Sequence, residues 1–263
     1  MLEFIRLARK RGAIADVFYI IFNLAFVALT FALIVIFPDT PWPAVVLLLI
    51  SKWRTVAVRP RYWWMNIVSS LPDLSFGAAI VVLMWLAGQN AMISGGIAWI
   101  AQLIFAAIYA GWLIWVKPKE GKNWVFIQAG VSQFFSFAAI FSVANRLSLA
   151  PVMILAFIIA FGVARQIFTQ YVETSRTLLA IIYGFIVAVI SFAAWHWTVG
   201  YAVGTLIEIP QAAIVIAAFG FALTKLYDAH QTSSIKWQTV GWPVVACGAI
   251  VFLVVIIGGA LFV

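Results

Sequence analysis

One acidic residue stands inside a long apolar stretch, and polar residues recur on its side of the expected helix. Asn66 and Ser70 precede Asp73 by seven and three residues, and Gly77 follows Asp73 by four, so all four share one helical stripe. An ionisable side chain at the centre of a spanning helix costs roughly 2.5–3.5 kcal/mol on insertion scales, which makes it a candidate for function. A carboxylate in this position can bind a cation or carry a proton.

Two other interpretations of Asp73 stay open at the level of sequence. The carboxyl can hydrogen-bond a neighbouring helix and lock the bundle, and Pro72 beside it frees a backbone carbonyl one turn earlier. Alternatively, the spanning stretch begins at Leu74, which would put Asp73 at a helix N-terminus near the membrane surface.

A second polar face lies on the apolar stretch that begins at Trp124. Gln128, Ser132 and Ser136 are spaced by four residues, and Gln133 falls on the same half of the helix. Such side chains join helices through hydrogen bonds worth about 0.6 kcal/mol on average, or they line a path for a solute. If this face meets the Asp73 stripe, the path consists of Asp73, Asn66, Ser70, Gln128, Ser132 and Gln133.

A secondary candidate site joins the end of one stretch to the start of the next. His196 and Glu208 are separated by a short segment containing Gly200 and Gly204, and together they suit proton transfer or cation binding. An ordinary aromatic belt at the membrane surface also explains His196, because tryptophans flank it on both sides.

Composition identifies the solvent in which these residues must work. Of the 263 residues, 66% are hydrophobic and 9% are charged, whereas soluble domains are about 45–50% apolar and about 25% charged. The chain cannot build a polar shell, so lipid must surround it as a single membrane domain over residues 1–263. The net charge of +8 falls in short clusters between apolar stretches, which argues against a nucleic acid partner.

Periodic apolar stretches predict an all-α bundle of about nine spanning helices. A ninth stretch, 42–58, is doubtful because Lys52 and Arg54 lie in its last third. If it spans, 15 of the 16 basic residues lie on the cytoplasmic side with the N-terminus, and only Arg146 lies outside. We therefore predict an N-in, C-out topology, with residues 1–16 cytoplasmic and residues 2–11 suited to an interfacial helix. The other eight expected spans are 17–37, 63–87, 91–116, 124–144, 149–168, 177–198, 205–225 and 242–263.

Motifs of enzymes and cofactor sites are missing from the sequence. It contains no phosphate-binding G-x-x-x-x-G-K-[ST] loop, no H-E-x-x-H zinc helix and no G-x-S-x-G nucleophile turn. The two histidines fall on opposite sides of the predicted membrane, so they cannot join Cys247 in a zinc site. We expect no cofactor and no metal, and enzymatic function is disfavoured.

Several motifs along the chain resemble those of uncharacterised multi-pass inner-membrane proteins of small-genome bacteria. They are Lys52-Trp53-Arg54, the run Arg59-Pro60-Arg61-Tyr62-Trp63-Trp64 with Asn66 and Asp73, Lys117-Pro118 and His196-Trp197. The resemblance implies a bacterial inner membrane and no particular activity.

The leading functional hypothesis is a transporter or channel-like protein for a small solute, an ion or a proton, with Asp73 as its charge. The alternative is a non-catalytic subunit or scaffold of a larger membrane complex, because the loops are short and residues suited to close packing are abundant. Expected partners are the bilayer, anionic lipid at the cytoplasmic basic loops, and other membrane subunits or further copies of the chain.

Overall fold

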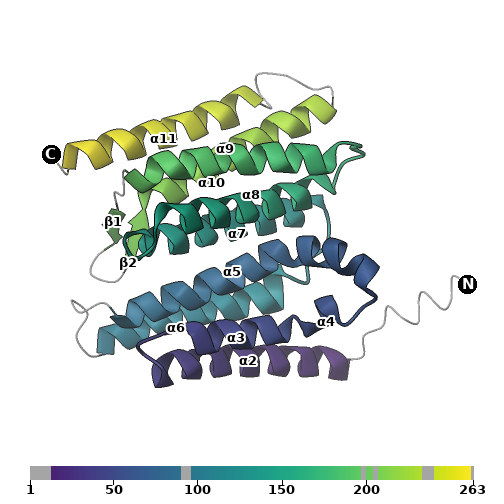
Figure 1. Ribbon diagram of the computed structural model, residues 1–263, viewed down its shortest axis with the longest axis vertical. Coiled ribbons are helices and arrows are strands. Elements are labelled where there is room, and N and C mark those ends of the chain that lie inside the picture. The colour runs from purple at the N-terminus through teal and green to yellow at the C-terminus, as the bar shows by residue number, and fades with distance from the viewer. Residues whose placement is uncertain (1–12, 90–95, 197–199, 204–206, 233–239, 262–263) are drawn as a thin grey trace, which may run out of the picture.

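The computed structural model describes residues 13–89, 96–196, 200–203, 207–232 and 240–261. Its long helices lie side by side, and successive long helices mostly alternate in direction (Figure 1), which confirms the predicted all-α class. The elements are α2 (Ala13–Ile36), α3 (Trp42–Ser51), α4 (Trp53–Val56), η1 (Pro60–Tyr62), α5 (Trp63–Gln89), α6 (Gly96–Gly111), η2 (Trp112–Val116), α7 (Lys122–Ser142), η3 (Ala144–Arg146), α8 (Leu149–Phe168), α9 (Arg176–His196), β1 (Gly200–Val203), β2 (Ile207–Pro210), α10 (Gln211–Gln231) and α11 (Trp242–Leu261).

Within the described residues, seven helices are long and apolar enough to cross a membrane. They are α2 and the helices from α5 to α10, with η2 extending α6. A spanning helix needs about 20 residues because the hydrocarbon core is about 30 Å thick and each residue rises about 1.5 Å. At 10 residues, α3 is too short to cross alone.

The doubtful stretch 42–58 forms two helices joined at a break. Lys52 ends α3 and begins α4, and its backbone angles, φ −94° and ψ 11°, depart from those of an α-helix. Together α3 and α4 carry the chain from the end of α2 back to the end of the bundle at which α2 began (Figure 1). The break therefore places Lys52 between two short helices rather than on a regular one.

The structure corrects the predicted span 205–225. A hairpin pairs Gly200 with Pro210 and Val203 with Ile207, and α10 begins only at Gln211. Hydropathy could not reveal this pairing, because the apolar residues of β2 look like the first turn of a helix. Since α10 continues to Gln231, Lys225 lies inside the helix and not at its end.

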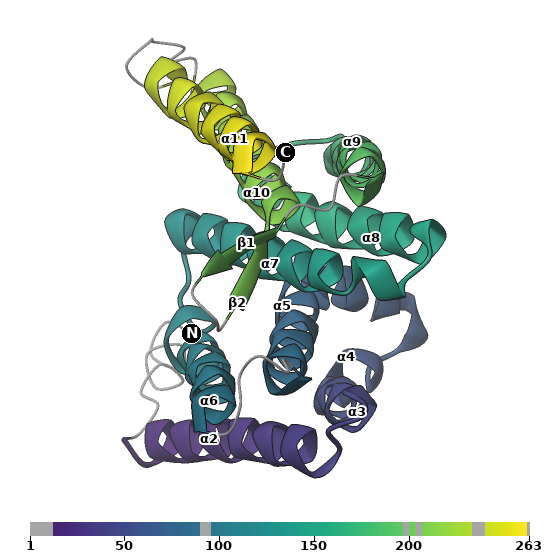
Figure 2. The ribbon, with the colours of Figure 1, turned by 90° about the vertical axis from the view of Figure 1, so that its left-hand side faces the viewer.

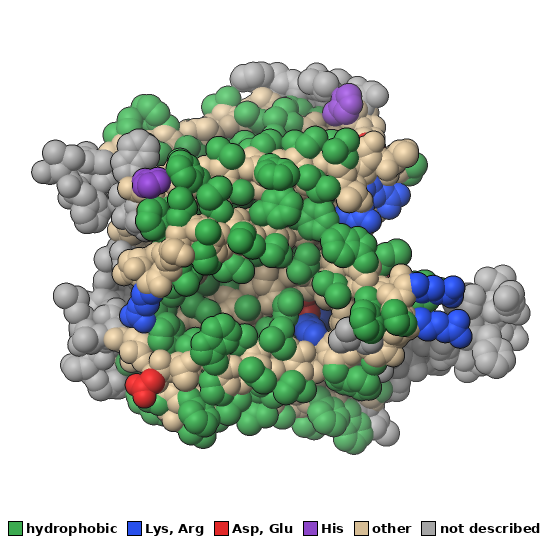
Figure 3. All heavy atoms as spheres, viewed as in Figure 1, with side chains coloured by type: hydrophobic (Ala, Val, Ile, Leu, Met, Phe, Trp, Pro, Cys, Tyr) green, Lys and Arg blue, Asp and Glu red, His purple; other side chains and the backbone are tan. Residues whose placement is uncertain are grey.

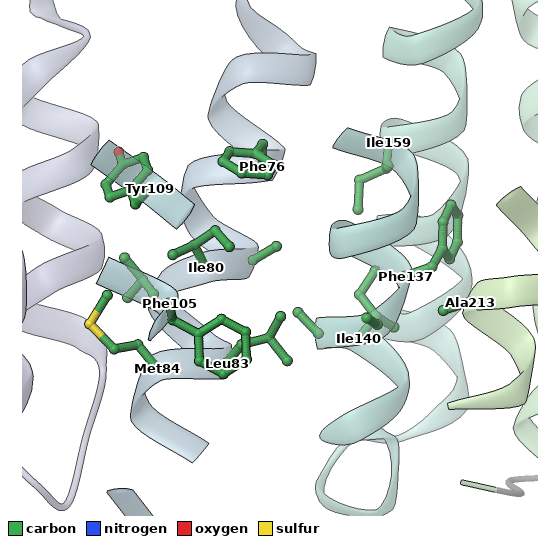
Figure 4. Packing of buried hydrophobic residues seen from close by; sticks show 14 of the residues in the cluster. Phe76, Ile80, Leu83, Met84, Phe105, Tyr109, Phe137, Ile140, Ile159 and Ala213 are labelled. Carbon is green, nitrogen blue, oxygen red and sulfur yellow. The ribbon is translucent and has the colours of Figure 1, made fainter. Parts of the chain in front are cut away.

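The core of the bundle lies between α5, α6, α7 and α8. Phe76, Ile80 and Met84 of α5 are fully buried and meet Phe105 and Tyr109 of α6 (Figure 4). Within the same cluster, α7 contributes Phe137 and Ile140, α8 Ile159, and α10 Ala213. Viewed along the bundle, α5 and α7 lie centrally while α10 and α11 extend away from the rest (Figure 2).

The outer surface is apolar over most of the length of the helices. Large hydrophobic side chains such as Phe22, Phe185 and Phe252 are exposed. Figure 3 shows hydrophobic side chains spread over most of one face of the molecule. Lys and Arg side chains on that face gather mainly at the end where α2 begins (Figure 3). The basic residues at this end, by the bounds of the helices, include Arg59, Arg61, Lys117, Lys119, Lys122, Arg165 and Arg176, while Arg146 lies in η3 at the other end.

Some sequence predictions fall outside the described residues. They include the interfacial helix over residues 2–11, the start of the span 91–116, Trp197 and Lys236. The side chains of Arg54 and Glu208 are likewise not described, although α4 and β2 contain their backbones.

Candidate functional site

Asp73 lies at the centre of a charged cluster built by three separate parts of the chain. The Nζ atoms of Lys52 and Lys117 both pair with Oδ2 of Asp73, and the Lys117 contact measures 2.8 Å. The indole Nε1 of Trp112 donates to Oδ1 over 3.0 Å. We call Lys52, Asp73, Trp112 and Lys117 the Asp73 cluster.

The helix α5 carries Asp73 well inside the bundle. Since α5 begins at Trp63, Asp73 lies ten residues along it, or about 15 Å at helical rise. The exposed aromatic residues Trp63 and Trp64 at its start suit the membrane surface. Because α5 runs unbroken through Pro72, the interpretation that a helix begins at Leu74 is wrong.

A π-helical turn brings Trp112 and Lys117 to the same carboxylate. In η2 the backbone N–H of Lys117 donates to the carbonyl of Trp112, five residues earlier. In an α-helix, residues five apart differ by about 140° around the axis, since each turn holds about 3.6 residues. The wider π turn brings both side chains towards Asp73, and such turns are frequent at functional sites.

Neighbouring contacts hold this turn in place. The ring of Trp112 stacks on Phe76 of α5 with centroids 3.9 Å apart. Gln128 of α7 donates to the carbonyl of Val116 over 2.8 Å and to that of Lys119 over 3.1 Å. The predicted path residue Gln128 thus supports the backbone on either side of Lys117.

The charges of the Asp73 cluster do not cancel. Two ammonium groups and one carboxylate sum to +1, from +1 +1 −1. The side chains remain partly accessible, at 21% for Lys52, 20% for Asp73 and 40% for Lys117. Figure 3 shows a basic and an acidic side chain together in a hollow of the apolar face. The cluster therefore carries an excess of positive charge and is not fully buried in the bundle.

Ser132 joins α7 to α5 beside the cluster. Its hydroxyl donates to the carbonyl of Pro72 over 2.5 Å and lies 3.1 Å from the hydroxyl of Ser75. Pro72 directly precedes Asp73 in the chain. The structure thus brings Ser132 and Gln128 close to the Asp73 cluster, an arrangement that the sequence left open.

Gln133 lies in a different network. Its Nε2 donates to the hydroxyl of Tyr183 over 2.8 Å and to the carbonyl of Ile216 over 3.0 Å, so it connects α7 with α9 and α10. Asn66 and Ser70 are half-buried on α5 before Asp73, and the hydroxyl of Ser70 donates to the carbonyl of Ile67. Gln133 therefore joins helices on another side of α7 from the contacts of Ser132 with α5.

The secondary pair, His196 and Glu208, is only partly described. His196 ends α9 with an exposed side chain, and its ring packs edge-on against Phe192 and Trp195 at centroid distances of 5.0 and 5.1 Å. Glu208 pairs through its backbone with Ala202, and its side chain lies outside the description. The contacts described for His196 are those of an aromatic belt.

A second polar cluster lies at the end of the bundle where α7 begins. Lys122 pairs with Asp228 of α10, and the hydroxyl of Tyr171 donates to the same carboxylate over 3.1 Å. Nearby, the hydroxyl of Tyr227 donates to Glu173 over 2.6 Å. This hydrogen bond, together with one from the backbone N–H of Ser175, lowers the pKa of the Glu173 carboxyl.

Sequence reasoning missed the partners of Asp73. It counted Lys52 among the basic residues on the cytoplasmic side and assigned no role to Trp112 or Lys117, whereas the structure turns both lysines inward to Asp73. The available signal was electrostatic: a lone membrane acid needs cations, and lysines near helix ends reach about one turn or more on their long stems.

The fold and the site together indicate a polytopic α-helical membrane protein with a charged cluster inside the bundle. No family model matches the sequence, and no curated protein or solved structure matches the chain. Within the described residues, no group of three His, Cys, Asp or Glu side chains is arranged to hold a metal ion.

Proposed function

We propose that this protein is a transporter or channel-like protein in which the Asp73 cluster contacts the solute as it passes. The observation that supports the proposal is a partly exposed set of charges at membrane depth, where ionisable groups are costly. A purely structural pair needs one cation for one carboxylate, whereas here two lysines share a single carboxylate oxygen.

The charge of the cluster favours an anion as the solute. A cation approaching Asp73 meets two ammonium groups, and a net charge of +1 repels it in a medium of low dielectric constant. An anion is instead attracted, because the two lysine ammonium groups share only one carboxylate. The geometry thus moves the proposal away from the cation or proton that Asp73 alone suggests and towards a small anionic solute.

The topology that we propose has nine spans, with the N-terminus in the cytoplasm and the C-terminus outside. Support comes from the alternating directions of successive helices and from the basic residues gathered at the end where α2 begins. In this orientation Arg146 lies outside, and the basic loops can hold anionic lipid on the cytoplasmic side. A bacterial inner membrane suits this arrangement.

Flux into liposomes tests the transport proposal. Purified protein would be reconstituted, and uptake of radiolabelled phosphate, sulfate, succinate and chloride would be measured beside ²²Na⁺ and proton uptake. We expect uptake of at least one anion, with Lys117→Gln lowering it at least tenfold. Lys119→Gln is the matched control, because Lys119 lies two residues away and its ammonium faces the Trp124 ring 5.6 Å from the centroid.

Asp73→Asn separates anion transport from proton transport. For an anion, loss of the competing carboxylate should lower both KM and the maximal rate, because the solute binds more tightly and leaves more slowly. For a proton, the same variant should abolish uptake. Unchanged anion uptake in both Asp73→Asn and Lys117→Gln would overturn the proposed role of the cluster.

A non-catalytic subunit or scaffold is the second candidate. It is favoured by the three donors that satisfy Asp73, since a fully paired carboxylate locks helices together. Native mass spectrometry of protein gently extracted from its own membrane distinguishes the two. A stoichiometric partner protein would favour the subunit, and a lone chain or small homo-oligomer would favour the transporter.

A further inference from the structure

An apolar groove of about 470 Å³ runs beside the Asp73 cluster. Its walls come from α3, α5, α7 and α8, and apart from Ser75 and Ser136 its lining side chains are Ala, Val, Leu, Ile, Pro and Trp. Figure 2 shows α3 and α8 flanking α5 on one side of the bundle, and Figure 3 shows that face as hydrophobic and hollowed. The groove has the size range, about 300–1,000 Å³, of sites that hold small ligands.

The two ends of the groove differ in chemistry. Pro41, Trp42 and Trp85 line the end at which α3 begins, and the guanidinium of Arg146 lies 5.2 Å from the centroid of the Trp85 ring. At the other end, Leu71 and Leu74 bring the groove to the depth of Asp73 on α5.

Lys52 pairs with Asp73, which lies between the groove-lining residues Leu71 and Leu74 in the chain. Trp42 and Val45 of α3 line the groove, and Lys52 lies directly after the end of α3, seven residues beyond Val45. Leu71 and Leu74 lie on one side of α5, about 60° apart around the helix axis. Asp73 lies on another side, because each residue turns the helix by about 100°. The Lys52 side chain can therefore serve either Asp73 or a ligand in the groove.

Asp73 can release Lys52 and stay paired. Lys117 holds the same oxygen at 2.8 Å, and Trp112 donates to the other oxygen. A carboxylate left with one ammonium and one N–H donor is still neutralised and hydrogen-bonded. The second lysine is thus available to an incoming anion.

Charge must provide the selectivity of this groove. Lipid around the protein is as apolar as the groove, so an uncharged chain gains little by leaving the bilayer for it. An anionic head group gains an ammonium partner at Lys52 that the hydrocarbon core does not offer. Ser136, which is 2% exposed and lines the groove, has a hydroxyl without a hydrogen-bond partner among the described residues.

We propose that the groove binds a single-chain anionic amphiphile, with its acyl chain along α3, α5 and α8 and its carboxylate or phosphate head on Lys52. This inference goes beyond the proposed function, with which it shares only the charged residues of the Asp73 cluster. Lys52 turns from Asp73 to the head group, while Lys117 and Trp112 keep Asp73 in place.

Binding of radiolabelled palmitate to the full-length protein in nanodiscs tests the proposal. Palmitate should bind at least tenfold more tightly than hexadecanol, which has the same chain without the charge, and more tightly than octanoate. Lysophosphatidic acid as a competitor shows whether a phosphate head binds as well as a carboxylate. Equal binding of palmitate and hexadecanol to the unaltered protein would overturn the proposal, and this comparison requires no variant to fold.

Substitutions in the charged cluster and in the apolar groove test the two parts of the site, because some should weaken palmitate binding and one should strengthen it. Lys52→Gln and Ala78→Phe should weaken palmitate binding at least tenfold, while Lys52→Arg should stay within about threefold. Asp73→Asn should strengthen binding because it frees Lys52, and Lys117→Gln should weaken it because Asp73 then retains Lys52. Ala217→Phe is the matched control for Ala78→Phe, because Ala217 lines the separate cavity between α7 and α10.

The results separate this inference from the proposed function. If the variants change palmitate affinity in these directions and no anion is taken up into liposomes, the groove is a binding site and the transport proposal is overturned. If Ala78→Phe leaves the uptake of small anions intact and no variant changes palmitate binding, the proposed binding site in the groove is overturned. The transport proposal is then upheld.

Discussion

The indole Nε1 of Trp112 lies 3.0 Å from Oδ1 of Asp73, which is 39 residues earlier in the chain. The contact joins the π turn after α6 to the middle of α5, and the stacking of Trp112 on Phe76 repeats that connection one turn further along α5. A hydrogen bond to an ionised group is stronger than one between neutral groups, so Trp112 orients the carboxylate for its two lysines. The cluster is therefore organised by an aromatic residue as well as by charge.

Removing this donor should weaken the fold modestly. We expect Trp112→Phe, which keeps the stacking on Phe76, to lower the free energy of unfolding by about 1.5–3 kcal/mol, the contribution of a hydrogen bond to a charged group. Denaturant titration in detergent micelles measures the change. Trp115→Phe is the control, because Trp115 lies in the same turn with an exposed side chain, and a loss of equal size there would contradict the role of Trp112.

Neutralising Asp73 should destabilise the protein unless a lysine is removed as well. Asp73→Asn leaves Lys52 and Lys117 close together without a counter-charge, and we expect a loss of about 1–2 kcal/mol, between the values for exposed and buried pairs. The double variant Asp73→Asn with Lys52→Gln should recover part of that loss. A double-mutant cycle measures the coupling, and strictly additive effects would show that the pair contributes nothing.

Gly77 allows α3 to approach α5 closely. A Cβ atom at this position would lie 2.5 Å from Cδ1 of Leu48 and 3.0 Å from the hydroxyl oxygen of Tyr109. We expect Gly77→Ala to lower the free energy of unfolding by about 1–3 kcal/mol, the usual cost of overpacking. Gly130→Ala in α7 should be neutral or stabilising, because no atom lies within 4 Å of its Cβ position. Thermal unfolding of both variants measures these changes, and an equal stability of the two variants would contradict the close approach at Gly77.

Gln133 should act as a connector of helices rather than as a path residue. Its contacts with Tyr183 and with the carbonyl of Ile216 join α7 to α9 and α10. We expect Gln133→Leu to cost about 0.6–1.7 kcal/mol of stability, as for hydrogen bonds in another membrane protein, and to leave anion uptake per folded molecule unchanged. Gln170→Leu, at a half-buried residue whose Nε2 donates to its chain neighbour Thr169, is the stability control. A selective loss of uptake in Gln133→Leu would return Gln133 to the path.

The Glu173 carboxyl provides a pH-dependent contact outside the spanning helices. Its pKa is lowered by the hydrogen bond from Tyr227, so the ionised carboxylate favours the folded state. This contribution is present above the unfolded pKa of the group and is lost as the pH falls through the lowered folded value. Tyr227→Phe should raise the pKa of Glu173 towards its ordinary range in a ¹³C NMR titration. An unchanged titration would show that the Ser175 N–H alone lowers it.

Hydropathy, which is a local property, was enough to predict the membrane-spanning helices. The predicted stretch 149–168 coincides with α8, and the stretches 63–87 and 124–144 differ from α5 and α7 by about one turn at most. Each spanning helix satisfies its own backbone hydrogen bonds, so no information from distant residues is needed to place it. The hairpin of β1 and β2 was not predicted, because strand pairing depends on a partner segment.

The sequence by itself determined that a carboxylate stands inside a long apolar stretch and that the chain carries an excess of positive charge. It also showed that Ser132 and Gln128 share a face, and the structure brings that face to α5 and η2. Only the tertiary structure decided which cations meet Asp73, because Lys52 and Lys117 come from helix ends whose approach depends on the α3–α4 break and the π turn. Long side chains reach many positions from one backbone site, and packing selects one of them.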